Sequence, residues 1–309
     1  MFSAATRGWE LAKKAYSNEA KSYRCNQQYK CLWHVLINPH FASRWFKKLY
    51  SPEYILITQH RPRIFIKPFR VYMSVRWNKR QKVKVILDTY QFIRSKGEGF
   101  LQAIICEKYF RLADFQLKDG STASIVLEYD ERYRKEGELG INLVCEKLGG
   151  VIAGGSFSFE NKENENWVCR IGCIQGHRNT EVNIAKTAQN LMYGLRPKAL
   201  MVFVIQEFTK HLGIRSVYGA GQSIQAYRRK HAINIPWFHK ISFDYNKLWL
   251  EHGGEPEKDG WFLLPSSPLR KDISEIKANK RAGYKRRYEM MDHISTDILC
   301  TLQQIVVPG

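Results

Sequence analysis

The stretch that decides the fold is ELGINLVCEKLGGVIAGGSFSFE at residues 138–160, followed by WVCRIGCIQG at residues 167–176. Apolar residues run through 138–145 and 151–160, and Lys147-Leu148-Gly149-Gly150 between them favours a hairpin turn. Residues 167–175 follow the two-residue alternation that is typical of a strand, so they predict a third one. Strands this close together in the chain predict a largely antiparallel sheet.

The rest of the second half alternates between helices and one more strand. Proline at position 197 suits the first turn of a helix, and Gly194 and Gly213 suit helix ends. Adjacent strands followed by a helical crossover and a further strand predict an α+β fold with a mixed, mainly antiparallel sheet and flanking helices. We expect a loop at 176–179, helices from Thr180 or Glu181 to Gly194, from Pro197 to Gly213 and over 223–231, and strands over 124–129 and 214–219.

Both ends of the chain are predicted to be helical. Trp9, Ala12 and Ala15 recur at helical spacing, as do residues 32, 35 and 36, and residues 83–92 follow the same period. We therefore expect a mainly helical, basic N-terminal layer at 1–110 and an α/β domain at 111–309 that ends in a long helix. Asp272, with Glu275 three residues later, indicates a capping box at the start of that helix.

The formal net charge is +20, and most of it lies near the N-terminus. Residues 1–100 contain 20 Lys and Arg against 5 Asp and Glu, while the other 209 residues contain 29 against 24. A region this basic attracts phosphate-bearing partners such as nucleic acid, anionic lipid or a nucleotide cofactor. The alternative is a cationic surface that serves only solubility, and charge alone does not separate these two interpretations.

The sequence favours a cytoplasmic protein, with a peripheral position at the inner face of the membrane as the alternative. The first 17 residues contain no apolar segment typical of a secretory signal. The longest apolar run, Ala199–Ile205, is far shorter than the roughly 20 residues that span a bilayer. Seven scattered cysteines form no CxxC pair, so we expect reduced thiols and no metal site.

Six short segments carry a family resemblance. They are IGCIQG (171–176), LRPKAL (195–200), LGIRSVYG (212–219), FDYNKLWLEHGG (243–254), DGWFLLP (259–265) and KRAGYKRRYEMMD (280–292). Their order and spacing resemble the VirK/YbjX family, a bacterial group of domains of unknown function. The resemblance implies a bacterial protein linked to virulence or envelope stress, and it implies no particular chemistry.

A second resemblance concerns Trp167 to His231, whose order of strand, turn, helix, strand and short helix is similar to the acyl-CoA-binding half of GCN5-related N-acetyltransferases. In that superfamily, a loop after a strand presents backbone N–H groups at a helix start to the pyrophosphate of coenzyme A. The superfamily pattern has a small residue where this chain has Arg178. The resemblance implies that coenzyme A or an acyl-CoA binds to Gln175, Gly176, Arg178, Asn179, Thr180, Arg228 and Arg229.

Two residues are candidates for the proton transfer that acyl transfer needs. His177 follows Gly176 in the loop, and its charge changes near neutral pH. Glu138 opens the first hairpin strand, where transferases of this kind often place a base. The alternatives are a solvated loop histidine and a surface carboxylate. Arg196 and Lys198, at a helix start, are expected either to hold phosphate or to lie in solvent.

The long C-terminal helix carries a basic face that suits polyanion binding or ordinary solvation. This face consists of Lys277, Lys280, Arg281, Lys285, Arg286 and Arg287. Two functions therefore remain open. One is an acyl-CoA-dependent acyltransferase, and the other is a non-enzymatic regulatory protein that binds nucleic acid or anionic membrane.

Overall fold

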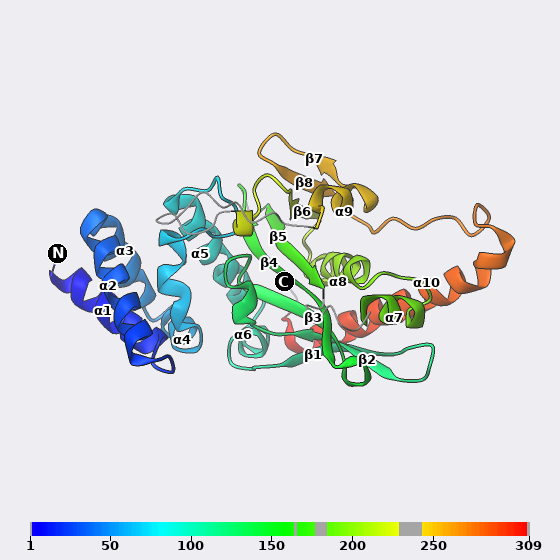
Figure 1. Ribbon diagram of the computed structural model, residues 1–309, viewed down its shortest axis with the longest axis horizontal. Helices are drawn as coiled ribbons and strands as arrows, with labels where there is room; N and C mark the ends of the chain where they lie inside the picture. Colours follow the sequence, from blue (N-terminus) through cyan, green and yellow to red (C-terminus); the bar gives the residue numbers. More distant parts are fainter. Residues whose placement is uncertain (1, 164–165, 177–183, 229–242, 308–309) are drawn as a thin grey trace. The chain divides into compact units, whose positions relative to one another are not determined.

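The computed structural model describes residues 2–163, 166–176, 184–228 and 243–307, with the backbone alone for Phe2, Ser3 and Arg228. The chain divides into two compact units, one of Met1–Val71 with Asn78–Lys82 and one of Tyr72–Trp77 with Val83–Gly309. Figure 1 labels the elements of both units. Whether residues 1–110 form a domain of their own stays a prediction.

The first unit is built from helices. They are α1 (Phe2–Ala15), α2 (Lys21–Ile37), α3 (Pro39–Leu49), α4 (Ile55–His60) and the 3-10 helix η1 (Pro62–Phe69). Proline opens both α3 and η1, because its fixed backbone angle suits a first helical turn and it has no N–H to leave unpaired. α1, α2 and α3 pack on one another and bury Leu11, Cys31 and Phe46.

Two further helices, α5 (Lys79–Ser95) and α6 (Glu98–Ile105), precede the first strand. α5 begins in the first unit and continues into the second. The mainly helical character predicted for the N-terminal region is therefore confirmed. The segment Tyr72–Trp77 belongs to the second unit, where Val75 N–H donates to Ile224 O (3.0 Å) and Trp77 stacks on Trp261.

The second unit is centred on an eight-stranded sheet with the order β1-β2-β3-β4-β5-β6-β8-β7 (Figure 1). Its strands are β1 (Phe110–Gln116), β2 (Thr122–Leu127), β3 (Leu139–Cys145), β4 (Gly150–Asn161), β5 (Trp167–Gly176), β6 (Ser216–Ala220), β7 (Glu255–Pro256) and β8 (Trp261–Leu264). β5 and β6 are parallel, and every other neighbouring pair is antiparallel. The predicted mixed, mainly antiparallel sheet is therefore confirmed.

The hairpin between β3 and β4 matches its sequence prediction. Its turn contains the short 3-10 helix η3 (Glu146–Leu148). Gly149 follows with a φ of 87°, which glycine adopts at little cost. Three strands were not expected from the sequence. β1 contains a register shift between Arg111 and Ala113 that interrupts its alternation. β7 and β8 have only two and four residues, which is too short for a clear period.

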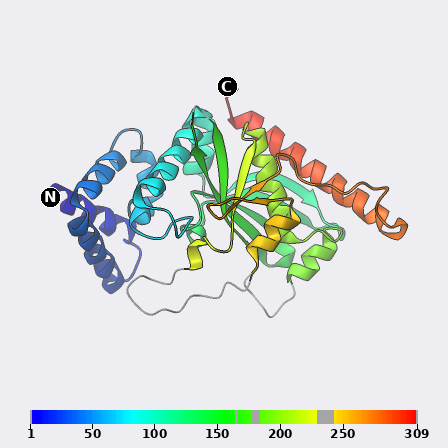
Figure 2. The ribbon, with the colours of Figure 1, turned by 90° about the horizontal axis from the view of Figure 1, so that it is seen from above.

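Helices α7 (Ile184–Leu191) and α8 (Pro197–His211) connect β5 to β6. α8 packs on β3, β4 and β5, and α10 (Ala278–Ile305) packs on α8 and β1 (Figure 2). The helix expected over 223–231 is the 3-10 helix η4 (Ala226–Arg228) in its described part. A further short helix, α9 (Tyr245–Glu251), was not expected. Across the described ranges, we find no helix with the length and apolar character that a membrane crossing requires.

The start of α10 corrects the capping-box prediction, because the helix begins at Ala278 and not at Asp272. Asp272 Oδ1 instead accepts hydrogen bonds from Ser274 N–H and Oγ–H (both 2.7 Å), so this carboxylate closes a local turn. Arg281 then joins the turn to the helix by donating to Ser274 O (3.0 Å) and Ile276 O (2.8 Å). The apolar residues Met291, Ile294, Ile298 and Leu302 form a buried stripe along the second half of the helix.

Candidate functional site

The two parallel strands of the sheet diverge at their carboxyl ends. β5 and β6 pair only as far as Ile171 with Gly219. Beyond this pair, β5 stays bonded to β4 as far as Gly176, while β6 stays bonded to β8 as far as Ala220. The last five residues of β5 therefore have a strand neighbour on one side only.

α9 covers the place where these strands diverge. Tyr245 Oη donates to Ile174 O on β5 (3.1 Å), and Trp249 Nε1 donates to Ala220 O on β6 (2.9 Å). Gly219 makes room for the indole, since a Cβ there would lie 2.4 Å from Cε2 of Trp249. Backbone carbonyls beyond the last strand pair are thus satisfied by side chains of α9.

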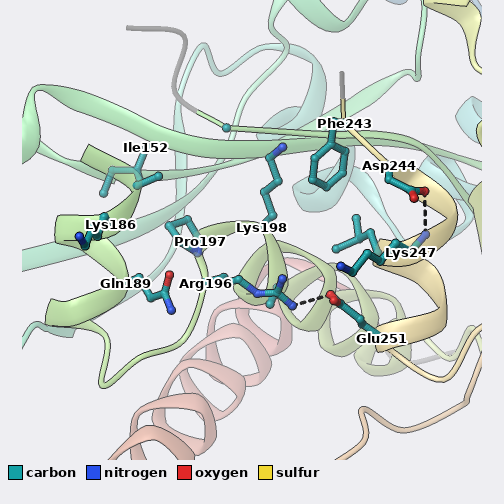
Figure 3. A pocket seen from close by; sticks show the side chains of 14 residues that line it. Ile152, Lys186, Gln189, Arg196, Pro197, Lys198, Phe243, Asp244, Lys247 and Glu251 are labelled. Carbon is teal, nitrogen blue, oxygen red and sulfur yellow. Dashed lines mark hydrogen bonds and ion pairs between the residues drawn. The ribbon is translucent and has the colours of Figure 1, made fainter. Parts of the chain in front are cut away.

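A cavity of about 470 Å³ lies at the end of β5 (Figure 3). β4, β5, α7, the first turn of α8 and α9 with the residues before it supply its walls. The lining residues are Ile152, Gly176, Ala185, Lys186, Gln189, Arg196, Pro197, Lys198, Ala199, Phe243, Asp244, Lys247, Leu248 and Glu251.

Lys198 is the half-buried cation of this cavity. Its Nζ lies 3.2 Å from the ring centroid of Phe243, and its Cε would lie 3.2 Å from a Cβ on Gly176 (Figure 3). Burial lowers the pKa of Lys198 from 10.5 to about 8, because removing water disfavours the charged form. No carboxylate among the described residues forms an ion pair with Lys198, so its charge is available to an anionic ligand.

Positive charge prevails around the cavity. Lys186 and Lys247 are exposed, and neither forms an ion pair with a residue of the described ranges. Arg196 pairs with Glu251 (2.5 Å), and Asp244 caps α9 by accepting from the backbone N–H of Lys247 (2.9 Å). The first turn of α8 has no side-chain cap, so the partial positive charge of that helix end also faces the cavity.

Three of the six segments that carry the family resemblance meet at this cavity. IGCIQG contributes Gly176, LRPKAL contributes Arg196 to Ala199, and FDYNKLWLEHGG contributes Phe243 and four further lining residues. Gly176, Arg196 and Lys198 were predicted from the sequence, whereas Phe243, Lys186 and Lys247 were not. The resemblance of FDYNKLWLEHGG was the available signal for Phe243, although nothing in that segment alone indicates a ligand.

Among the predicted cofactor-binding residues, Gly176 lines the cavity and Gln175 is half-buried beside it on β5. The side-chain amide of Gln175 lies 3.7 Å from Cys173 Sγ. Arg228 ends η4, and its side chain is not described. The remaining predicted residues lie outside the described ranges; they are His177, Arg178, Asn179, Thr180 and Arg229.

Glu138 is buried, so its interpretation as a surface carboxylate was wrong. It is 1% exposed and accepts hydrogen bonds from the hydroxyls of Tyr90 (2.6 Å) and Tyr72. Its backbone N–H donates to Ser158 Oγ on β4 (3.0 Å). The cavity reaches β4 at Ile152, several residues away along the strand, so the structure does not bring Glu138 to the cavity.

The predicted basic face of α10 is partly engaged within the unit. Arg287 donates to Tyr193 O (2.7 Å) and stacks on Tyr284, while Arg281 joins the preceding turn. Arg286 and Lys118 line a second, more open hollow of about 530 Å³. Five cations of the predicted face are exposed: Lys277, which precedes α10, and Lys280, Arg281, Lys285 and Arg286 within it.

The part of the chain that the structure describes holds no group of three His, Cys, Asp or Glu side chains that could bind a metal ion. The cavity itself offers amines, a guanidinium and a helix start, which suit an anionic ligand.

Comparisons with known proteins identify relatives along most of the chain. The family model described as "Protein of unknown function (DUF535)" matches residues 20–299. A protein of Escherichia coli (strain K12) named "Uncharacterized protein YbjX" is 26% identical over 279 residues, which are 88% of this chain and 82% of that protein. An "Uncharacterized protein" of Haemophilus influenzae (strain ATCC 51907 / DSM 11121 / KW20 / Rd) is 25% identical over 74% of this chain and 73% of its own length. No solved structure matches the chain.

Proposed function

The chain belongs to the family of proteins of unknown function DUF535, and within it we propose an acyltransferase that uses a coenzyme A thioester to modify an amine or a hydroxyl. In this proposal, the cavity at the end of β5 holds the phosphate-bearing part of the cofactor. The observation that carries it is the convergence of Gly176, Lys198 and the uncapped first turn of α8 on one cavity of about 470 Å³.

The strand arrangement supports this assignment. The resemblance to GCN5-related N-acetyltransferases implied a strand, a helical crossover and a parallel strand, with an anion site at the crossover end of the first strand. β5, α7, α8 and β6 follow that order, and β5 and β6 separate beyond Ile171 and Gly219. Tyr245 and Trp249 already donate hydrogen bonds to the backbone carbonyls where the strands separate. We therefore place the cofactor's phosphates in the cavity and not between the two strands.

The electrostatics of the cavity support a ligand with phosphate groups. Lys198 has a pKa of about 8, so it is mostly protonated at neutral pH while it is poorly hydrated. A phosphate would replace the missing water and favour the charged amine. Lys186 and Lys247 add charge at the rim, and Gly176 lets a ligand approach the backbone because it has no Cβ.

Acyl transfer needs few further groups. The lone pair of an amine or hydroxyl attacks the thioester carbonyl, the carbon–sulfur bond breaks, and the thiol leaves with a proton while a base takes the proton of the nucleophile. We assign the base to His177, which follows Gly176 in the chain. Glu138 has no part in this scheme, because it is bonded to two tyrosines away from the cavity.

Calorimetry with coenzyme A, acetyl-CoA and longer acyl-CoAs tests the proposal. Wild-type protein should bind at least one of them, and Lys198→Met should weaken binding by about 1.5–3 kcal/mol, the scale of a hydrogen bond to a charged group. Gly176→Val should abolish binding without unfolding the chain, because its side chain would block the approach of a ligand to the backbone and would also crowd Lys198, whose Cε lies 3.2 Å from an added Cβ.

The matched control is Lys162→Met. Lys162 also lies over an aromatic ring, with Nζ 4.1 Å from the ring centroid of Tyr218, but it does not line the cavity. This variant should keep wild-type affinity. Failure of the wild-type protein to bind every one of these thioesters at millimolar concentration would refute the proposal.

A second candidate function is polyanion binding by a regulatory protein without catalytic activity. It is favoured by Lys280, Lys285 and Arg286 of α10, which are exposed and form no ion pair within the described residues. The cytoplasmic location and the link to virulence or envelope stress that the family resemblance implies stay predictions.

A further inference from the structure

Helix α2 turns its large apolar side chains toward solvent. Tyr29, Trp33, Leu36 and Ile37 are between 57% and 65% exposed. Their spacing of four, seven and eight residues places all four on one face of the helix. Single exposed apolar residues are ordinary, but a contiguous stripe of this size marks an interaction surface.

The opposite face of α2 buries polar side chains. Gln27 and Gln28 are each 4% exposed, beside the fully buried Cys31 and Val35. Arg70 Nη2 donates to Gln27 Oε1 (2.5 Å), which compensates for burial of that amide. A surface helix normally turns its large apolar side chains inward, whereas α2 leaves four of them exposed and buries two glutamines.

The unit around this stripe is strongly basic. Met1–Val71 with Asn78–Lys82 contains 16 Lys and Arg against 3 Asp and Glu. Two of these carboxylates are already paired, Glu19 with Arg63 and Glu53 with Lys48. Lys30 is exposed and precedes Trp33 by three residues, which places it on the flank of the stripe. A partner for this surface must therefore carry negative charge and also accept apolar side chains.

We propose that the outer face of α2 docks on the surface of an anionic lipid bilayer. Tyr29 and Trp33 suit the headgroup level, Leu36 and Ile37 suit the outer acyl chains, and the surrounding cations suit anionic headgroups. Nucleic acid fits less well, because Leu36 and Ile37 offer it neither a stacking plane nor a charge. This surface involves none of the cavity residues, so it is independent of the acyltransferase proposal.

Co-sedimentation of the full chain with vesicles tests the proposal. The protein should bind vesicles of phosphatidylglycerol and phosphatidylcholine in equal parts and should not bind pure phosphatidylcholine. Leu36→Ser with Ile37→Ser should weaken binding about tenfold, because affinity scales with buried apolar area. The matched control is Leu250→Ser with Leu269→Ser, which removes two leucines that are 58% and 65% exposed elsewhere; it should bind like wild type.

Lipids brominated near the headgroup separate insertion from adsorption by charge alone. The chain has eight tryptophans, so the signal of Trp33 is taken as the difference between wild type and Trp33→Phe. Quenching should affect wild type and largely disappear in Trp33→Phe. The proposal is overturned if anionic vesicles do not bind, if the two double variants bind equally well, or if Trp33 is not quenched. It is also overturned if Leu36→Ser with Ile37→Ser impairs binding to a nucleic acid duplex and spares vesicles.

Discussion

Helices α2 and α8 have similar lengths and opposite relations to solvent. α8 has 15 residues and buries eleven of them, whereas α2 has 17 residues and buries four. α8 lies against three strands and against α10, so almost every direction is covered by protein. α2 packs against α1 and α3, and its outer face is exposed as far as the described residues extend. A helical period therefore identifies the helix, while the neighbouring elements determine which of its faces is buried.

In each helix, the candidate functional surface lies where the burial of side chains does not match their polarity. In α8 this is the first turn, where the charged Lys198 is half-buried beside the cavity. In α2 it is the outer stripe, where the apolar Trp33 and Leu36 are exposed. Burial of polar groups and exposure of apolar ones both cost free energy, which is why such places indicate a ligand or a partner.

The largest expected effect contrasts the two helices directly. Phe208 of α8 is fully buried against Phe157 and Phe100, so Phe208→Ala should lower the free energy of unfolding by about 3–5 kcal/mol. Trp33→Ala removes a larger ring from the exposed face of α2, and it should change the free energy of unfolding by less than about 0.5 kcal/mol. Urea denaturation of both variants measures the difference. A strong loss of stability in Trp33→Ala would mean that its face is covered in solution.

An intermediate effect is expected where α9 meets the diverging strands. Gly219→Ala would place a Cβ 2.4 Å from the Trp249 ring, and the resulting strain should cost about 1–3 kcal/mol and weaken ligand binding by shifting α9. Gly283→Ala is the control, because nothing lies within 4 Å of its added Cβ inside α10. The control should be stabilising by up to about 1 kcal/mol. Equal melting temperatures for the two variants would contradict this packing.

The smallest effect concerns α10, a third helix whose exposed face is basic and not apolar. Lys280→Glu with Lys285→Glu should weaken binding to a nucleic acid duplex and reduce the slope of log affinity against log salt by about 2. The control is Lys108→Glu with Lys258→Glu, which reverses the charge of two exposed lysines elsewhere. This control should change the slope less. Filter binding at several salt concentrations measures the slopes. Equal slopes in the two variants would leave this face with a role in solubility only.

The sequence predicted the parts of the fold that depend on local periods. Strands β2 to β5, the crossover helix α8 and the helical N-terminal region follow from alternation or helical spacing, and the family match confirms the relationship predicted from the six segments. β1 and β8 and the start of α10 were not predicted, because β1 contains a bulge, β8 is short and Asp272 closes a local turn. For the site, Gly176 could be predicted from its place at the end of a strand. Phe243 could not, because only tertiary contact brings it to Lys198.

Lys198 also links stability to pH. Its pKa is about 8 in the folded chain and 10.5 when unperturbed, so between these values the unfolded chain binds more protons. The penalty for burying the charged amine is fully present below pH 8 and disappears as pH rises toward 10.5. Lys198→Met should therefore raise the melting temperature more at neutral pH than at high pH. The same difference measured for Lys162→Met should be smaller.

The most direct test of the cavity as a cofactor site is an NMR titration of the Lys198 side chain with and without coenzyme A. The resonance is assigned by its disappearance in Lys198→Arg. In the free protein it should titrate near 8, well below 10.5, and saturating coenzyme A should raise this pKa because a phosphate favours the charged amine. A titration midpoint that coenzyme A leaves unchanged would contradict the assignment of this cavity to the cofactor.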